Sequence, residues 1–468
     1  MKKLFLLSLL SLTLATTPSC KKYLDIRPYG KIIPKTPEEF ASLLHDRLGA
    51  IDEARSEDWL LGNADRLADW DGGYGDDFET ALFPTNLPVY LGDLVGTTRA
   101  YTPWTQLYQL IRDCNICIAG IPDSSTDKTG RRALATAYAL RGAAYYQLIR
   151  LYAPAPQAGK LSDQLGVPLV TEVDIEAHPQ RSSLQETLDQ AERDLLASIA
   201  LQNDQSIFRF TQEVAQGYLA RLYFWSEQWA KAAPLAEALL QKHPLTSGET
   251  FVKMTTERSG TLQGNQLLKS GRIIASNDQA YTNAKTNIAR RPISLRYIDA
   301  FPEAERTLDQ RYLSWVGKKR AVKKEFFAGL RSAELLLIAA ECRAHLGQDT
   351  EALALINQLR AHRLTTDTPL TLATLPGKSS QEIITVDATG KALTTLLATI
   401  LRERRKELLL EGDRFFELKR NGSPSWSTLA DGRTYITASY MYTLPIPPID
   451  ITLSHLKQND HYEDYINQ

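Results

Sequence analysis

Cysteine is scarce in this chain, with four residues in 468. Cys114 and Cys117 have the C-x-x-C spacing of a redox or metal pair, but a zinc site needs a second pair and only Cys342 remains downstream. Apolar residues recur at helical spacing around Cys114 and Cys117, so we interpret both as small hydrophobic residues on the core face of a helix. A redox or metal pair is the alternative.

Neither sign of charge dominates, because 54 Lys and Arg residues stand against 55 Asp and Glu residues, for a net charge of −1. This balance gives no support for binding to nucleic acid or for a basic patch that contacts a membrane. Beyond the N-terminal leader, no apolar run approaches the roughly 20 residues that a transmembrane helix needs. With 43% hydrophobic and 23% charged residues, the composition is that of a globular protein with ample core.

Common catalytic and metal motifs are also missing. Neither H-E-x-x-H nor G-x-S-x-G occurs, and the seven histidines are scattered without ligand spacing. The segment 377–379 ends like a P-loop, but Leu372 occupies the position of its first glycine. The acidic segment 69–79 lacks the ligand order of an EF-hand, so we interpret its carboxylates as solvated loop acids, with calcium binding as the alternative. We therefore expect no metal and no cofactor.

The N-terminus has the layout of a secretory signal peptide. Basic residues at positions 2 and 3 precede a leucine-rich run over 4–15 and a short small-residue segment over 16–19, and Cys20 follows. A cysteine at this position suggests a bacterial lipoprotein, in which 1–19 are removed and Cys20 is lipidated to anchor the protein in a membrane. An ordinary signal peptide followed by an incidental cysteine is the alternative.

Helical periodicity dominates the rest of the chain. Amphipathic helices are expected over 104–121 and 131–152, and over the segment that begins at Ser182 or Ser183, either of which can cap it. The segments 221–240 and 341–360 align with each other, and Ala232 then corresponds to Ala352 and Gln228 to Gln348. Each segment reads as two helices joined by a tight turn, as in tetratricopeptide repeats.

Three long, less regular insertions separate these helical pairs, at about 52–102, 243–330 and 364–390. The third contains a β-prone stretch, 382–386, between turn signals, and this pattern favours a small hairpin. We therefore predict a mostly α-helical fold, with irregular tetratricopeptide-like helix pairs, loop-rich insertions and minor β-hairpins. Residues 20–468 are expected to form a single domain. Long loops on a rigid scaffold are where binding sites usually lie.

The end of the chain resembles the SusD/RagB family, nutrient-binding lipoproteins of the Bacteroidetes outer membrane. The segment ERRKELLLEGDRFFELKRNG, 403–422, precedes a P-I-P stretch and fits a family motif at Glu403, Arg404, Glu407, Leu408, Glu411, Gly412, Arg414, Leu418 and Arg420, with Glu417 where the family commonly has Asp. Leu24, Asp25 and Pro28 fit the segment that follows the lipidated cysteine in that family. The resemblance continues in order over nearly the whole chain.

The resemblance implies a non-enzymatic protein, lipid-anchored in the outer membrane and facing the cell exterior. Such a protein binds an oligosaccharide, or less often a peptide, and works with a SusC-like TonB-dependent transporter. Two alternatives from other classes are a tetratricopeptide-type scaffold that binds a protein partner in the envelope and a lipid-anchored hydrolase.

The charged segment 403–422 allows a structural and a catalytic interpretation. If it forms one helix, Glu403, Glu407 and Glu411 fall on one face at i, i+4 and i+8. Arg404, Arg414 and Lys419 could then pair with them or with neighbouring helices. Paired carboxylates can hydrolyse a glycosidic bond, but they must line a cleft at suitable separations, which one helix face does not establish. A helix that docks through salt bridges is the favoured interpretation.

The first insertion contains our candidate ligand site, NADRLADWDGGYGDDFE, 63–79. The rings of Trp70 and Tyr74 could offer flat apolar faces to a sugar, and Trp315 is a further candidate platform. Hydrogen bonds to sugar hydroxyls are expected from the polar residues of the segment, Asn63, Asp65, Arg66, Asp69 and Asp76. The alternative is that Trp70 or Tyr74 pins the loop to the helices.

Overall fold

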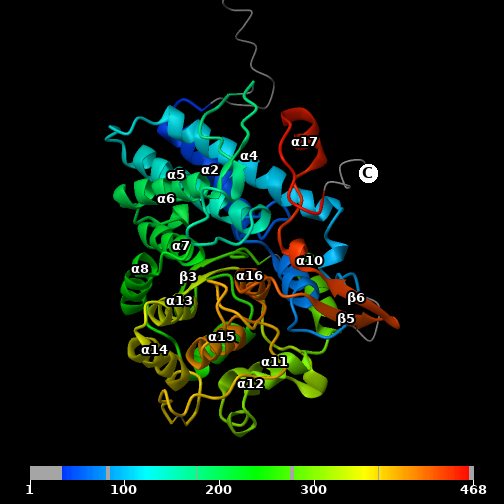
Figure 1. Ribbon diagram of the computed structural model, residues 1–468. Coiled ribbons are helices and arrows are strands. Elements are labelled where there is room, and N and C mark those ends of the chain that lie inside the picture. Colours follow the sequence, from blue (N-terminus) through cyan, green and yellow to red (C-terminus); the bar gives the residue numbers. More distant parts are fainter. Residues whose placement is uncertain (1–33, 81–84, 175, 275–278, 367, 463–468) are drawn as a thin grey trace, which may run out of the picture.

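The computed structural model describes residues 34–462, except 81–84, 175, 275–278 and 367 (Figure 1). The predicted signal peptide, Cys20 and the segment up to residue 33 lie outside the described residues. Within the described ranges, no helix has the length and apolar character needed to cross a membrane.

Helices pack one on the next to form most of the body (Figure 1). The series comprises α2 (Pro37–Asp52), α4 (Thr98–Gly120), α5 (Lys128–Tyr152), α6 (Leu184–Ala200), α7 (Gln212–Trp225), α8 (Trp229–Lys242), α13 (Ser332–His345), α14 (Asp349–Ala361) and α15 (Thr395–Glu407). Helix α8 packs against α13, so the chain returns to the helical series after its longest insertion. The mostly helical fold predicted from the sequence is confirmed.

The two aligned segments form equivalent helix pairs, α7–α8 and α13–α14. Gln228 and Gln348 precede the second helix of each pair with nearly the same backbone angles, φ −84° and ψ 59° against φ −94° and ψ 62°. Ala232 and Ala352 are fully buried, where a larger side chain would keep the two helices apart. Ser183 caps α6 as expected, since its hydroxyl accepts the Glu186 N–H at 3.2 Å while the Glu186 carboxylate accepts the Ser183 N–H at 2.8 Å.

The insertions are more ordered than their composition predicted. The first two insertions contain α3 (Ala64–Asp69), η2 (Trp70–Tyr74), η3 (Leu91–Asp93), α9 (Gly248–Thr256), α10 (Gln279–Ala289), α11 (Leu295–Asp299), η5 (Glu303–Glu305), α12 (Gln310–Trp315) and η6 (Lys318–Arg320). The remaining short helices lie outside the insertions and are η4 (Ser206–Phe208), α16 (Arg414–Arg420), η7 (Ser439–Tyr442) and α17 (Pro448–Ser454). A second apolar core joins the first and second insertions, and its large side chains from the second insertion include Phe251, Tyr297 and Trp315. Burial of these large side chains explains why the segment folds rather than looping into solvent.

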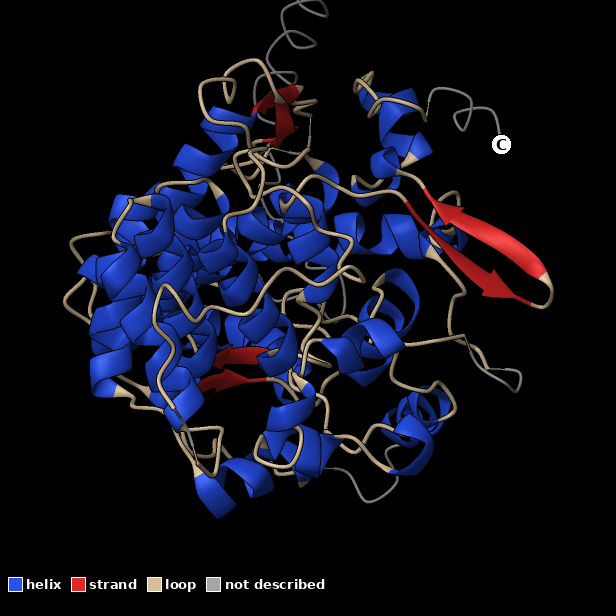
Figure 2. Ribbon diagram, turned by 60° about the horizontal axis from the view of Figure 1, so that its bottom comes forward, coloured by secondary structure: helices blue, strands red, loops and turns tan. Residues whose placement is uncertain are grey.

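The β-structure of the described residues consists of two-stranded antiparallel pairs (Figure 2). They are β1 (Leu165–Pro168) with β2 (Arg181–Ser183), β3 (Gln266–Lys269) with β4 (Gly329–Arg331), and β5 (Trp426–Ala430) with β6 (Arg433–Thr437). The hairpin expected around 382–386 is reduced to one isolated bridge, Val386 with Ala392. The hairpin β5–β6 projects from the side of the molecule opposite α8, α13 and α14 (Figure 1).

The three cysteines among the described residues belong to the core. Cys114, Cys117 and Cys342 are free and fully buried. Burial raises the pKa of the Cys114 thiol well above its ordinary value and that of Cys117 to about 12, so neither forms a reactive thiolate near neutral pH. The core interpretation of the C-x-x-C pair is confirmed.

Candidate functional site

Segments from the first and second insertions meet at the hairpin β5–β6. Phe78 forms a β-bridge with Ile293, and the Leu295 N–H donates to Glu79 Oε1 at 3.0 Å. The Thr80 hydroxyl reaches across to the hairpin and donates to the Leu429 carbonyl at 2.8 Å. The tertiary structure thus joins residues that lie hundreds of positions apart in the sequence.

Four half-buried side chains gather on this surface, which we call the hairpin face: Tyr90, Arg296, Trp426 and Tyr435. In the hairpin register Trp426 pairs with Thr437 and Thr428 with Tyr435, so the Trp426 and Tyr435 rings lie diagonally on the same side. The ring centroids of Tyr90 and Tyr435 are 5.1 Å apart, and the Arg296 guanidinium lies 5.7 Å from the centroid of the Trp426 ring. Partly exposed rings beside a guanidinium can bind a ligand that has a flat apolar face and polar edges.

A hollow of about 280 Å³ adjoins the hairpin face. It lies between α11, the third insertion and α15, and Arg296 belongs to both its wall and the hairpin face. Its other polar lining residues include Lys378, Ser379, Glu382 and Arg402.

A larger concavity, about 910 Å³, lies between residues 154–165, the turn 387–390 and the C-terminal segment 457–461. Its aromatic lining residue Tyr440 packs against His461 at 5.0 Å and Tyr462 at 5.4 Å between ring centroids. Because its lining is mainly polar and contains a single tyrosine and no tryptophan, this groove is a weaker candidate for stacking a ligand than the hairpin face.

The rings predicted as ligand platforms, Trp70, Tyr74 and Trp315, are buried, so none of them presents an open face to a sugar. Trp70 is 8% exposed, Tyr74 is 1% and Trp315 is 0%. The Trp70 ring packs 4.7 Å from Phe415 between centroids, and Trp315 Nε1 donates to the Thr255 hydroxyl at 3.0 Å. These contacts agree with the alternative that Trp70 or Tyr74 pins the first insertion to the helices, and Trp315 is packed in the same way.

The polar residues of 63–79 also serve local structure and do not converge on one ligand. Asn63 Oδ1 caps α3 by accepting the Arg66 N–H at 3.1 Å, and the Arg66 guanidinium lies over the Trp59 ring. Asp65 is exposed, and Asp69 forms an ion pair with Arg99 at 3.4 Å.

Asp76 and its neighbour Asp77 were expected to be solvated, and this prediction is also wrong. Both are buried, and they accept from Arg414 Nε and Arg405 Nε respectively, each at 2.7 Å. Burial alone would raise the pKa of Asp76, but Arg405 and Arg414 hold it below the ordinary range. Within the described part of the chain, no group of His, Cys, Asp and Glu side chains could hold a metal ion.

The charged segment 403–420 is not one helix. Helix α15 ends at Glu407, Leu410 and Gly412 adopt positive φ (57° and 71°), and α16 starts at Arg414. The Gly412 N–H donates to the buried Asp71 carboxylate at 2.9 Å, which ties the turn between α15 and α16 to the first insertion. The i, i+4, i+8 face expected for the three glutamates is therefore wrong at Glu411, which lies beyond the helix.

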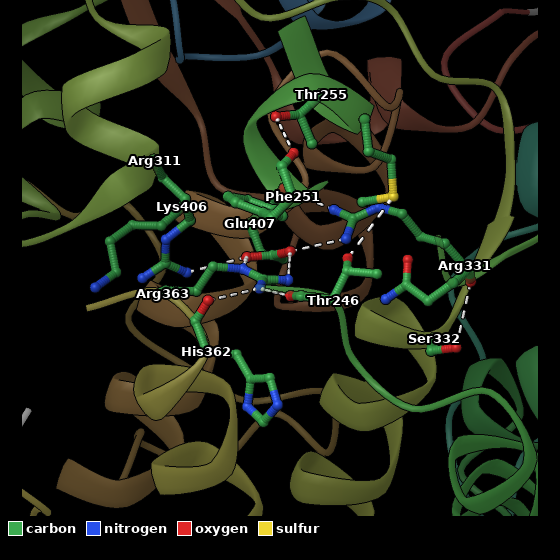
Figure 3. Close-up of polar contacts among 12 residues, drawn as sticks. Thr246, Phe251, Thr255, Arg311, Arg331, Ser332, His362, Arg363, Lys406 and Glu407 are labelled. Carbon is green, nitrogen blue, oxygen red and sulfur yellow. Dashed lines mark hydrogen bonds and ion pairs between the residues drawn. The ribbon is translucent and has the colours of Figure 1, made fainter. Parts of the chain in front are cut away.

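Arginines nevertheless connect the three glutamates in one network, and Figure 3 shows its centre at Glu407. Both oxygens of Glu407 are engaged, Oε1 by Arg331 and Arg363 and Oε2 by Arg311 and Arg363, at 2.7–3.2 Å. Arg331 also reaches Glu411, at 2.8 Å.

The other motif residues pair in the same way. Glu403 Oε2 accepts from Arg311 at 2.8 Å, and Arg404 and Arg420 pair with Asp413 and Glu341 respectively, at 2.5 Å each. Burial alone would raise the pKa of Glu407, but Arg363 and Arg331 lower it well below its ordinary value. A glutamate held ionised by several arginines is a poor general acid, so the network fits the structural interpretation of the motif.

None of the four residues of the hairpin face was predicted from the sequence. A signal for the hairpin was present, because Asp431-Gly432 stands between two runs of alternating residues, and Asp-Gly is a strong predictor of a tight hairpin turn. Asp431 and Gly432 adopt φ of 50° and 71°, as such a turn requires. No comparable signal marks Tyr90 or Arg296, which only the tertiary structure brings to the hairpin.

Two protein-family models match the chain. One, described as "Starch-binding associating with outer membrane", matches residues 90–224, and the other, the SusD family, matches residues 308–466. Together they cover more than half of the chain. In a search of curated proteins, no protein matches.

Several solved structures are similar over most of their length. A SusD superfamily protein from Bacteroides vulgatus has a TM-score of 0.68 at 20% identity, covering 92% of this chain and 100% of its own. A SusD-like carbohydrate binding protein from the same species has a TM-score of 0.64 at 19% identity, with 92% and 98% covered. A laminarin binding SusD-like protein has a TM-score of 0.60 at 16% identity, with 91% and 99% covered.

Proposed function

Because this chain belongs to the SusD/RagB-like family, we propose that it binds an oligosaccharide on the hairpin face. The observation that carries the proposal is the set of partly exposed rings, Tyr90, Trp426 and Tyr435, beside the Arg296 guanidinium. Sugar rings present C–H groups that pack on aromatic faces, and their hydroxyls take hydrogen bonds from flanking polar groups. The carbohydrate and laminarin ligands named for two structural relatives support the same ligand class.

The protein then acts in nutrient capture at the cell surface. Lipidated Cys20 anchors it in the outer membrane, facing the exterior, and it delivers its ligand to a SusC-like TonB-dependent transporter. The family description that associates starch binding with the outer membrane supports this location. The role is non-enzymatic, and the engagement of Glu403, Glu407 and Glu411 by buried cations supports that assignment over a lipid-anchored hydrolase.

Retardation in glycan-containing gels tests the proposal directly. In a panel of soluble polysaccharides from plants, algae and host tissue, we expect at least one to slow the migration of the protein. We expect the protein to release no reducing sugar from that polysaccharide on long incubation. Release of product would favour the hydrolase. Retention only by peptides or by an envelope protein, with no glycan retained, would contradict the proposal and favour the scaffold alternative.

A further inference from the structure

The hollow beside the hairpin face is lined by three cationic side chains and one carboxylate. The cations are Arg296, Lys378 and Arg402, which come from α11, the third insertion and α15 respectively. At about 280 Å³, the hollow is close to the lower limit of about 300 Å³ that is typical of small-ligand pockets. Arg296 connects it to the Trp426 ring, so a ligand on the hairpin face can extend a substituent into it.

Within the described residues, none of these three cations forms a salt bridge with a carboxylate, although the charge of Arg296 also helps to lower the pKa of the buried Asp76. Arg402 Nη2 donates to the Gly377 carbonyl at 2.6 Å, and Lys378 Nζ donates to the Leu393 carbonyl. Both contacts fix the side chain but leave its charge uncompensated and most of its N–H donors unused. For Arg296, no hydrogen bond or ion pair to another described residue is found, and its contact is with the Trp426 ring.

The nearby carboxylates already have partners. Glu382, which lines the hollow, accepts from Arg405 at 3.0 Å and from Arg414 at 2.7 Å, one arginine on each oxygen. Asp299 accepts from the Ser379 hydroxyl. The buried acid Asp76 is likewise engaged by Arg405 and Arg414. The one carboxylate that lines the hollow, Glu382, is therefore neutralised by arginines, whereas the three lining cations have no salt-bridge partner among the described residues.

We propose that this hollow binds an anionic substituent of the glycan, a uronate carboxylate or an ester sulfate, and so selects acidic over neutral chains. The inference rests on the proposed function, because it concerns the same bound glycan. A guanidinium presents paired N–H donors whose geometry matches the two oxygens of a carboxylate or sulfate. The ring contacts on the hairpin face are independent of ligand charge, so they supply affinity while the hollow supplies the preference.

Calorimetric titration with matched ligand pairs tests the inference. One pair is an oligogalacturonide and its carboxyl-reduced neutral counterpart; the other is a sulfated galactan oligosaccharide and its desulfated form. We expect the protein to bind the acidic member of one pair about tenfold or more tightly than its neutral counterpart, as the loss of one charge-assisted hydrogen bond predicts. The pair that shows the preference identifies carboxylate or sulfate.

The variant Lys378→Gln with Arg402→Gln is expected to lose this preference and to keep its affinity for the neutral ligand, because neither residue belongs to the hairpin face. Lys378→Arg with Arg402→Lys, which keeps both charges, should retain the preference. The matched control, Lys242→Gln with Lys253→Gln, removes the same charge from lysine side chains that are 59% and 56% exposed on other helices, and should behave as the unmodified protein.

Two results would overturn the inference and leave the proposed function standing. They are equal affinity for both members of each pair, and a preference that survives in the double glutamine variant. If no acidic or neutral glycan binds, the result contradicts both the proposed function and the inference.

Discussion

Replacing Glu407 with alanine is expected to lower the free energy of unfolding by about 3–5 kcal/mol, the usual cost of leaving a buried charge without its partner. Glu407 is fully buried and holds Arg311, Arg331 and Arg363, all three of them buried as well. Without it, three guanidinium groups face one another in a medium of low dielectric. Denaturant unfolding followed by circular dichroism measures the change.

The matched control is Glu249→Ala, which removes an i,i+4 partner of Lys253 on the surface, where the two side chains are 79% and 56% exposed. Its effect should stay within about 0.5 kcal/mol. The double variant Glu407→Leu with Arg363→Met should recover part of the loss, since it removes one buried charge of each sign. A Glu407→Ala cost below about 1 kcal/mol would show that the network does not stabilise the fold.

The same network gives the protein a predicted weakness in acid. Burial would raise the pKa of Glu403, but Lys406 and Arg311 lower it from 4.5 to about 2. A carboxylate with a depressed folded-state pKa contributes stability above its unfolded pKa and loses that contribution as the pH falls. The stability that Glu403 provides is therefore complete near neutral pH and is lost between about pH 4.5 and 2.

The triple variant Tyr90→Ala, Trp426→Ala, Tyr435→Ala is expected to weaken glycan binding at least about 100-fold, because the three rings supply most of the apolar contact on the hairpin face. All three are half-buried, so the loss of stability should be modest beside the loss of affinity. Calorimetry with the glycan found by gel retardation measures the affinity, and a thermal melt checks the fold.

A tyrosine elsewhere supplies the control for that variant. Tyr440→Ala removes a ring from the larger groove, where His461 and Tyr462 already pack against it, and should leave the affinity unchanged. If Tyr440→Ala abolishes binding and the triple variant does not, the ligand binds in that groove.

The helix pairs could be predicted from the sequence because their signals are local. Apolar spacing, the Ser183 cap and the correspondence of Ala232 with Ala352 depend only on neighbouring residues. The break in the charged segment was also marked locally, since Gly412 stands where the backbone needs positive φ, but the regular spacing of the glutamates favoured a continuous helix.

The ligand surface could not be predicted in the same way, because composition does not determine which aromatic rings are covered. Trp70 and Trp426 both stand among small and polar residues, yet Phe415 and Phe416 cover Trp70 while Trp426 stays half-buried on the hairpin. The hollow is a stronger case, since Arg296, Lys378 and Arg402 come from three separate segments. Only tertiary packing brings such residues together.

Hydrogen–deuterium exchange with and without saturating glycan tests most directly whether the ligand binds on the hairpin face. We predict slower exchange in the bound protein over residues 85–93, 293–299 and 426–437, which contribute Tyr90, Arg296, Trp426 and Tyr435. Residues 154–165 and 457–461, which line the larger groove, should exchange at the same rate in both states. Protection confined to that groove, with the hairpin unchanged, would contradict the account.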